Sequence, residues 1–532
     1  MKKFIYSLLA ILLIFGATSC HDLEETNIDP NNPAVVSSAS LMNGAQKKMM
    51  DYIFDNWFSG RQALVYSQYW AQRNYTEEDR YQIRESVNNN YFNVLYTVAG
   101  NLQNIEKLNT DPATKVAMAI YGNNENQIAA AKILKVWLMQ VMADTWGSIP
   151  YSEAFKLKEG VVYAKYDDLT SIYADFIKEL DEAIAMINED EPAFTTGDLI
   201  YAGDAAQWKK FGNSLKCKVA LRLSKVDTNW KKYIQEAVTS GVFTSNDDNA
   251  VFTYLTTDPD QSYFYRGFFV DSRNDFSIAK PFTNLLKGVA DNLNGKSHPW
   301  VGVTDPRLPI YTTPRGGAYN GIPYGLKSNQ MTSAIRNAAP TFYSASNHPV
   351  VLEPNFKAPY LTYAEVCFIL SEYQNFDQAK YEEGIRASIE YWDGLNVDLL
   401  GKAPISAEAI DAYVDAVNNN VNAEAVATQK YIHLYMNGPE AWAEYRRTGY
   451  PTTLLFPGEI SHVVDGVNLL FEPISDTKGD LPARVKYPTN ESTLNGDNFS
   501  AAVAKLQDGT NNYYTKMFWD VRTKSNPHPA NR

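Results

Sequence analysis

Hydrophobic residues recur at spacings of three and four along much of the chain, which is the pattern of amphipathic helices. From Asp167 to Ile187 the apolar positions fall on one stripe, whereas from Asn126 to Trp146 they cover more than one side. A helix of the second kind needs neighbours on both sides. Asp204 is expected to cap a third helix, with Gln207 as its reciprocal partner. We expect further helices at 361–372, 376–394, 405–419 and 422–447.

The helical pattern fades between residues 241 and 360, where aromatic residues remain frequent. Residues 295–360 contain 6 Gly and 9 Pro, and the last part of the chain is again rich in Pro. Such segments favour turns and cannot form continuous helix. A rigid frame that carries long irregular segments is a common way to display a binding surface.

These patterns predict a mainly α-helical protein, in which helix pairs stack as in a solenoid although no fixed repeat length is visible. No Gly/Ser-rich or Pro-rich linker is long enough to divide the chain after residue 40, so we expect one globule over 41–532. Its helical scaffold would span about 41–240 and 361–450, and its loop-rich ligand region about 241–360 and 451–532.

The N-terminus has the features of a secretory signal peptide. Lys2 and Lys3 precede an apolar run, and small residues lead to Cys20. We therefore expect a signal peptide at 1–19, lipidation of Cys20, and a lipid anchor and tether at 20–40.

The formal net charge and the positions of the cysteines limit which binding partners and which cysteine sites the chain is expected to have. Cleavage before Cys20 removes two of the 48 basic residues and none of the 61 acidic ones, which leaves a formal charge of −15. An acidic protein of this kind is not expected to bind nucleic acid. Cys217 and Cys367 lie in apolar helical patterns without metal-ligand spacing, so both are predicted to be buried thiols.

Catalytic and cofactor motifs are scarce. The chain contains no HExxH, GxSxG or GxGxxG sequence, and Ala290 stands where a phosphate loop ending in Gly295-Lys296-Ser297 needs its first glycine. Carboxylate pairs are expected by chance among so many acids, and His433 is predicted to be a core residue. We expect no enzyme activity and no cofactor. A structural calcium ion stays open, because loop oxygens bind calcium without leaving a motif.

Aromatic residues are the chain's main candidates for ligand contact, and the sequence contains 35 Tyr, 10 Trp and 24 Phe. The C–H faces of sugars lie flat on aromatic rings while neighbouring polar groups bind the hydroxyls. The stretch QYWAQRNYTEEDRY at 68–81 mixes rings with polar residues in this way, as do residues 263–266 and 269–275.

Several motifs, in order along nearly the whole chain, resemble those of the SusD/RagB family of nutrient-binding outer-membrane lipoproteins. The motifs are NIDPNNP at 27–33, DTWGSIPYSEA at 144–154, WKKFGNSL at 208–215 with Arg222, SNDDNA at 245–250, TYAEV at 362–366, MNGPEAWAEYRRTG at 436–449, and ARVKYP at 483–488 with Glu491.

This resemblance implies a scaffold of tetratricopeptide-like helix pairs and a partner, a TonB-dependent (SusC-like) transporter barrel on which the lipoprotein sits as a hinged lid. It implies glycan or peptide capture without catalysis, and a place on the outer membrane facing the cell exterior. The acidic residues Asp22, Glu24 and Glu25 are similar to the family's surface-export signal. Trp146, Trp208 and Trp442 lie within the shared motifs, and we assign them to the scaffold.

The resemblance points to a ligand-binding region and not to particular residues, because the ligand surface varies within the family. Core packing is the commoner role of an aromatic ring in a helical protein. We predict ligand contacts from seven residues: Trp70, Tyr75, Tyr81, Tyr265, Arg273, Trp300 and Tyr324.

A glycan-binding lipoprotein is the favoured interpretation. A peptide-binding lid of the same family would need an extended groove or an exposed strand edge. A surface glycoside hydrolase would need a carboxylate pair inside the aromatic cleft. A purely structural lipoprotein would have neither ligand nor transporter partner.

Overall fold

The computed structural model describes residues 36–341 and 348–523. The expected signal peptide at 1–19, Cys20 and the acidic residues after it lie outside the described residues. Among the residues described, no helix is both long and apolar enough to cross a membrane.

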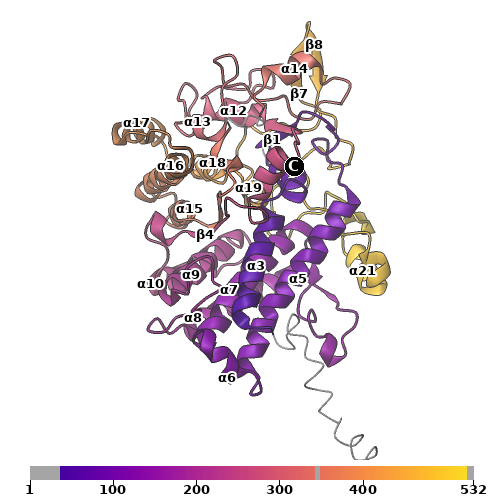
Figure 1. Ribbon diagram of the computed structural model, residues 1–532. Helices are drawn as coiled ribbons and strands as arrows, with labels where there is room; N and C mark the ends of the chain where they lie inside the picture. Colours follow the sequence, from indigo (N-terminus) through magenta and orange to yellow (C-terminus); the bar gives the residue numbers. More distant parts are fainter. Residues whose placement is uncertain (1–35, 342–347, 524–532) are drawn as a thin grey trace, which may run out of the picture.

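A layer of long helices fills the lower half of the molecule in Figure 1, and consecutive helices pack side by side. The helices of the first half are α3 (Ser38–Ile53), α5 (Glu85–Thr110), α7 (Asn124–Trp146), α8 (Leu169–Met186), α9 (Ala205–Arg222) and α10 (Trp230–Ser240). Those of the second half are α15 (Tyr363–Tyr373), α16 (Gln378–Leu400), α17 (Ala407–Val417), α18 (Ala423–His433) and α19 (Gly438–Thr448). Because α15 packs on α9, the two halves form one scaffold, which confirms the predicted helix-pair architecture.

The predicted helix over 422–447 is wrong as a single element, since the structure divides it into α18 and α19. Met436 between them has a φ of +71°, and Pro439 begins the new helix. Gly438 lies so close to the backbone of residues 63 and 64 that a Cβ there would be 2.7 Å from the carbonyl carbon of Ala63. Tertiary packing therefore breaks a pattern that reads as continuous helix.

The predicted cap of α9 forms only in part. The Asp204 carboxylate accepts from the backbone N–H of Gln207 at 3.1 Å. The backbone N–H of Asp204, however, donates to the carbonyl of Tyr201, so Gln207 makes no return bond to it. The N-terminal end of α9 therefore depends on the aspartate alone.

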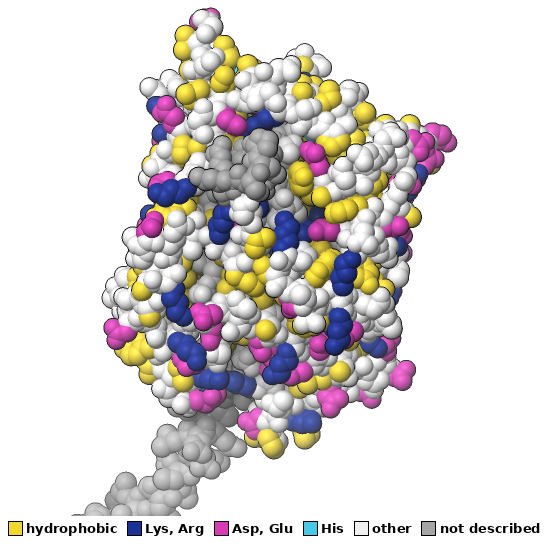
Figure 2. Space-filling model, turned by 180° about the vertical axis from the view of Figure 1, so that it is seen from behind, with side chains coloured by type: hydrophobic (Ala, Val, Ile, Leu, Met, Phe, Trp, Pro, Cys, Tyr) yellow, Lys and Arg dark blue, Asp and Glu magenta, His cyan; other side chains and the backbone are white. Residues whose placement is uncertain are grey.

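Short helices and two-stranded ribbons lie between the long helices and in the predicted loop-rich regions. The helical ones include α6 (Lys115–Met118), α11 (Tyr263–Tyr265), α12 (Lys280–Leu286), α13 (Leu308–Tyr311), α14 (Ser333–Ala338), α20 (Glu491–Leu494) and α21 (Gly496–Ala504). Four antiparallel two-stranded ribbons join β1 (Trp70–Gln72) to β5 (Phe276–Ile278), β2 (Ile149–Pro150) to β3 (Tyr166–Asp167), β4 (Ala250–Thr253) to β6 (Lys357–Leu361), and β7 (Ile460–Val464) to β8 (Val467–Leu470). The β7–β8 hairpin projects from the top of the molecule, with hydrophobic side chains along its sides (Figure 2).

The residues assigned to the core by sequence are buried. Trp146, Trp208 and Trp442 pack inside the scaffold, and Cys217 and Cys367 are buried free thiols. The ring of His433 lies within 2.6 Å of the Thr362 hydroxyl and 2.9 Å of the Ser388 hydroxyl. These contacts satisfy both ring nitrogens without any catalytic partner.

A buried charge network holds α7, α9, α15, α18 and α19 together. The Arg222 guanidinium donates to both oxygens of Glu440, at 2.7 and 2.8 Å, and also to Glu444. The members joined by ion pairs are Lys218, Arg222, Lys430 and Arg447 with Asp144, Glu365, Glu372, Glu440 and Glu444. Removing one partner of such a buried pair costs about 3–5 kcal/mol, because the other charge is left without compensation. The polar residues of the shared sequence motifs thus stabilise the scaffold.

Candidate carbohydrate-binding surface

Trp70 lies in the core, contrary to its prediction as a ligand platform. Its exposed fraction is 0%, and its ring packs against Phe264, Phe268 and Phe276 at centroid distances of 5.2–5.8 Å. The indole N–H donates to the Tyr435 hydroxyl at 3.0 Å. A ring without exposed area has no free face on which a sugar can stack.

The polar neighbours of Trp70 suggested a surface position but are themselves buried with partners. Gln68 bonds the backbone of Leu455 in both directions, at 2.6 and 2.8 Å. Gln72 donates to the Glu78 carboxylate at 2.6 Å. Because β1 is covered on both faces, the polarity of this stretch reflects internal hydrogen bonding and not exposure to water.

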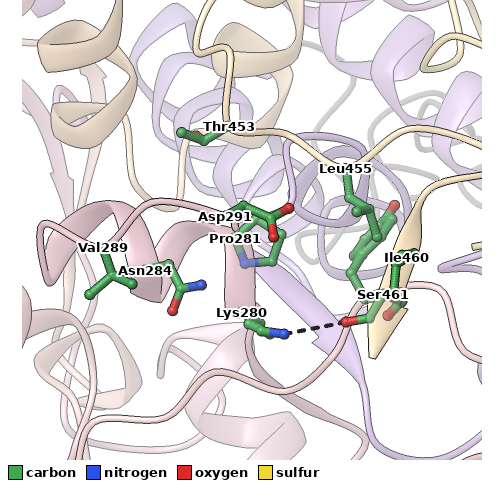
Figure 3. Close-up of a pocket in the computed structure, with 10 residues that line it drawn as sticks. Lys280, Pro281, Asn284, Val289, Asp291, Thr453, Leu455, Ile460 and Ser461 are labelled. Carbon is green, nitrogen blue, oxygen red and sulfur yellow. Dashed lines mark hydrogen bonds between the residues drawn. The ribbon is translucent and has the colours of Figure 1, made fainter. Parts of the chain in front are cut away.

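Three further predicted ligand residues are also core residues. Tyr81 and Tyr324 each pack edge-on against Phe471, and the Trp300 indole donates to the carbonyl of Val417 at 3.1 Å. Tyr324 lines only a small cavity of about 20 Å³, which has room for a water molecule and not for a sugar (Figure 3).

The structure brings the other three predicted residues toward one region, around the end of the β1–β5 ribbon. Tyr75 is 62% exposed, and the preceding Asn74 donates to the carbonyl of Asn274 at 3.3 Å, next to Arg273 in the segment that leads into β5. Tyr265 is half-buried and packs at 5.2 Å from the ring of Phe269. Their contact with a ligand stays a prediction.

The most exposed tryptophan was not among the predicted residues. Trp57 is 41% exposed, whereas the other nine tryptophans are buried or half-buried. The guanidinium groups of Arg61 and Arg273 lie over its ring, at 4.5 and 5.3 Å from the centroid. The local sequence Asn56-Trp57-Phe58 gives no periodic signal that separates it from core aromatics.

Local backbone structure holds Trp57 at the surface. α3 ends at Ile53, and the Asp55 carboxylate accepts from the backbone N–H groups of Phe58 and Ser59, both at 2.9 Å, where the π-helix η1 (Ser59–Ala63) begins. Trp57 stands in the intervening turn. π-Helical turns are rare and occur often at functional sites.

A second π-helix, η5 (Arg266–Val270), packs against this turn. The Asn56 amide donates to the carbonyl of Tyr263 at 2.7 Å. Gly267 allows the approach, since a Cβ there would lie 1.5 Å from Asn56 Nδ2. The turn that carries Trp57 is thereby fixed to the segment that carries Tyr265 and Arg273.

Trp57 forms one wall of a cavity of about 460 Å³ between the end of α3, the start of α5 and α11. Phe58 and Tyr91 stack at 3.7 Å on another side. The cavity is lined by Asp51, Tyr52, Asp55, Trp57, Phe58, Ser86, Val87, Asn90, Tyr91 and Tyr263. Aromatic walls with a few convergent polar groups are the usual composition of a small-ligand site.

Both carboxylates of this cavity have structural partners. Lys47 donates to Asp51 at 2.6 Å, and Asp55 caps η1 as described above. Burial raises the pKa of Asp51, and burial raises that of Asp55 to about 7. The charge of the cavity therefore changes near neutral pH. Within the described residues, no group of three or more His, Cys, Asp or Glu is placed to hold a metal ion.

Comparisons with known proteins agree with this architecture. Residues 30–468 match a family model, SusD-like_2, described as "Starch-binding associating with outer membrane". Comparison with curated proteins gives no match.

Solved structures with the same fold cover nearly the whole chain. A chitin-binding protein is 26% identical, with a TM-score of 0.71, over 91% of this chain and 100% of that one. A SusD homolog from Parabacteroides distasonis ATCC 8503 is 22% identical, with a TM-score of 0.71, over 91% and 98% of the two chains. A chitin-binding SusD homolog from Flavobacterium johnsoniae is 21% identical, with a TM-score of 0.66, over 90% and 98%.

Proposed function

Since the chain belongs to the SusD-like family, we propose that it is a cell-surface lipoprotein that captures an oligosaccharide or polysaccharide. The family comprises outer-membrane-associated binding proteins and not enzymes. The observation that carries the proposal is the exposed ring of Trp57, which forms one wall of a cavity of about 460 Å³.

Ring stacking with a few polar contacts suits reversible capture. A stacked aromatic ring contributes about 0.5–1.5 kcal/mol. The exposed Tyr75 and the half-buried Tyr265 add rings to the same region, and Asn90 and Arg273 provide hydrogen-bond donors. Two or three stacked rings with these bonds give a Kd of about 1 mM to 1 μM, which favours release to a transporter.

The delivery step is part of the same proposal. Lipidation of Cys20 would anchor the chain in the outer membrane, facing the cell exterior, and a TonB-dependent (SusC-like) transporter would receive the glycan. The family description, which includes association with the outer membrane, supports this arrangement.

Native affinity electrophoresis tests the capture step. The chain from residue 21 onward, which lacks Cys20, is run through gels that contain different soluble polysaccharides. Retardation by at least one glycan is expected. A protein that no glycan retards, and that recovers no transporter when the full-length lipoprotein is pulled down from membranes, would contradict the proposal.

A further inference from the structure

Two arginines beside the candidate surface are joined to each other without a carboxylate between them. Arg73 donates to the carbonyls of Arg336 and Pro340 at 2.8 and 3.1 Å and to the Ser277 hydroxyl at 2.9 Å. Arg336 donates back to the carbonyl of Arg73 at 2.9 Å. Throughout the described ranges, no acidic side chain lies within ion-pair distance of either guanidinium. Within the described residues, both guanidinium groups donate to neutral oxygens, and no carboxylate pairs with either charge.

A third cation adds to this pair. Arg315 lies on an exposed turn, and no ion pair to it is found among the described residues. Burial, and next the charges of Arg315 and Arg336, lower the pKa of Arg73 to about 10. Arg73 and Arg336 are thus hydrogen-bonded to each other, and Arg315 adds a third positive charge that acts on Arg73, on a chain whose formal net charge is −13. Such an arrangement is stabilised when an anion binds.

The nearby acids are already engaged. Asp275 pairs with Arg61 at 3.0 Å and with Arg273 at 3.6 Å. Glu78 pairs with Arg84 at 2.5 Å, and Glu77 accepts from the Ser328 hydroxyl at 3.1 Å. None of these carboxylates compensates the arginine cluster.

A cavity of about 580 Å³ lies on the other side of α14, between this helix, β7, residues 320–323 and the start of α12. Ile335 and Val464 form part of its apolar wall. Its polar side chains are Lys280, Asn284, Asn320, His462, Thr332 and Asp465, with Asp465 exposed in the hairpin turn.

The polar groups of this cavity are largely unused. The Lys280 ammonium makes one long hydrogen bond, 3.4 Å to the carbonyl of Ser461 (Figure 3). For the side chains of Asn284, Asn320 and His462, no hydrogen bond to any described residue is found. Convergent polar groups with free bonding capacity in a partly apolar cavity of about 300–1,000 Å³ are the composition of a ligand site.

We propose that the captured glycan carries carboxylate or sulfate groups, and that cations on the two sides of α14 receive them: Arg315 and Arg336 on one side, with the charge of the buried Arg73 behind them, and Lys280 in the cavity on the other side. This inference rests on the proposed glycan capture and narrows its ligand class. Guanidinium groups bind carboxylates and sulfates with paired, charge-assisted hydrogen bonds. A neutral glycan makes no ion pair with these cations, whereas a carboxylate or sulfate does.

Matched polysaccharides test the proposal by affinity electrophoresis. The panel contains polygalacturonate and its carboxyl-reduced form, chondroitin sulfate and its desulfated form, and neutral glucans and chitosaccharides. We expect retention by an acidic member and its loss on reduction or desulfation, which also separates carboxylate from sulfate recognition. Retention should weaken as salt is raised, because screening acts on exposed charges.

Two variants test whether residues on the two sides of α14 contact the acidic groups of the glycan. Arg315→Gln and Lys280→Gln should each weaken acidic retention about tenfold, as expected for the loss of one charge-assisted contact. Arg315 is exposed, so its replacement leaves folding unchanged. Arg386→Gln is the control, since Arg386 lies on α16 in a surface ion pair with Asp411. It should bind like the unmodified protein.

Each outcome is decisive. Retention by neutral glycans alone overturns the acidic-ligand inference and leaves glycan capture standing. Acidic retention that neither variant weakens overturns the assignment to α14. Retention by no polysaccharide of either class counts against glycan capture itself.

Discussion

Replacing Trp57 by Ala should weaken glycan binding without unfolding the protein. Trp57 is 41% exposed, which for a side chain of about 250 Å² leaves about 100 Å² free for a ligand. Covering all of it would contribute about 2.5 kcal/mol at ~25 cal/mol per Å². A sugar ring that covers about half contributes about 1.3 kcal/mol, so Kd should rise about ninefold.

The assay is affinity electrophoresis over a range of polysaccharide concentrations, from which Kd is obtained, together with chemical unfolding. Loss of the contacts to Arg61 and Arg273 should lower stability by no more than about 1–2 kcal/mol. Trp230→Ala is the matched control, because Trp230 is a half-buried tryptophan on α10 that also carries a lysine, Lys231, over its ring at 5.3 Å.

Trp70→Ala separates binding from folding. It removes a fully buried ring and should cost about 3–5 kcal/mol of unfolding free energy, while the folded fraction keeps its affinity. If Trp57→Ala binds as tightly as the unmodified protein, the stacking surface has been assigned to the wrong ring.

Three further predictions concern the scaffold and the turn that carries Trp57. Arg222→Met should lower the free energy of unfolding, measured in urea, by about 3–5 kcal/mol. The control Arg386→Met, which breaks an exposed ion pair with Asp411, should lower it by less than about 1 kcal/mol. Equal losses in the two variants would refute a special role for the buried network. Burial lowers the pKa of His433 to about 3. As the pH falls below about 6.5, the unfolded chain therefore takes up a proton that the folded protein does not. The free energy of unfolding then falls by about 1.4 kcal/mol per pH unit. His433→Gln should make the urea midpoint less sensitive to pH between about 7.5 and 4.5, and an unchanged pH slope would show that other groups set it. Gly267→Ala should weaken glycan retention, because its Cβ would displace Asn56 and with it Trp57. The control Gly394→Ala on α16, where a Cβ meets no atom within 4 Å, should have no effect. Equal retention in the two variants would contradict the coupling of the two turns.

The scaffold was predictable because its signals are local. The apolar stripe of α8, the all-round apolar pattern of α7 and the capping carboxylate of Asp204 act within a few residues of each other, and the structure has these three features as expected. The break between α18 and α19 was not predictable, since it depends on contact between Gly438 and residues 63–64, far away in the sequence.

Ring exposure was the least predictable property of the candidate site. Trp70 and Trp57 both stand among polar residues, yet the neighbours of Trp70 turn inward to bond Leu455 and Glu78, while Trp57 is held outward by the Asp55 cap. Whether a polar neighbour faces water or a distant backbone carbonyl depends on tertiary structure. Sequence therefore pointed to Tyr75, Tyr265 and Arg273, which the structure leaves at least partly exposed, but ranked a buried tryptophan above the exposed Trp57.

The buried charge network also sets the order in which the chain completes its structure. Arg222 and its partner Glu440 are 218 residues apart, so at a synthesis rate of about 5–20 residues per second Glu440 emerges about 10–40 s after Arg222. During that interval the ion pairs that join α9 to α19 cannot form. Without their partners, the charged groups of Arg222 and Lys218 are more stable in water than buried in the protein. The ion pairs that join the two halves of the scaffold therefore form only after most of the chain has been made.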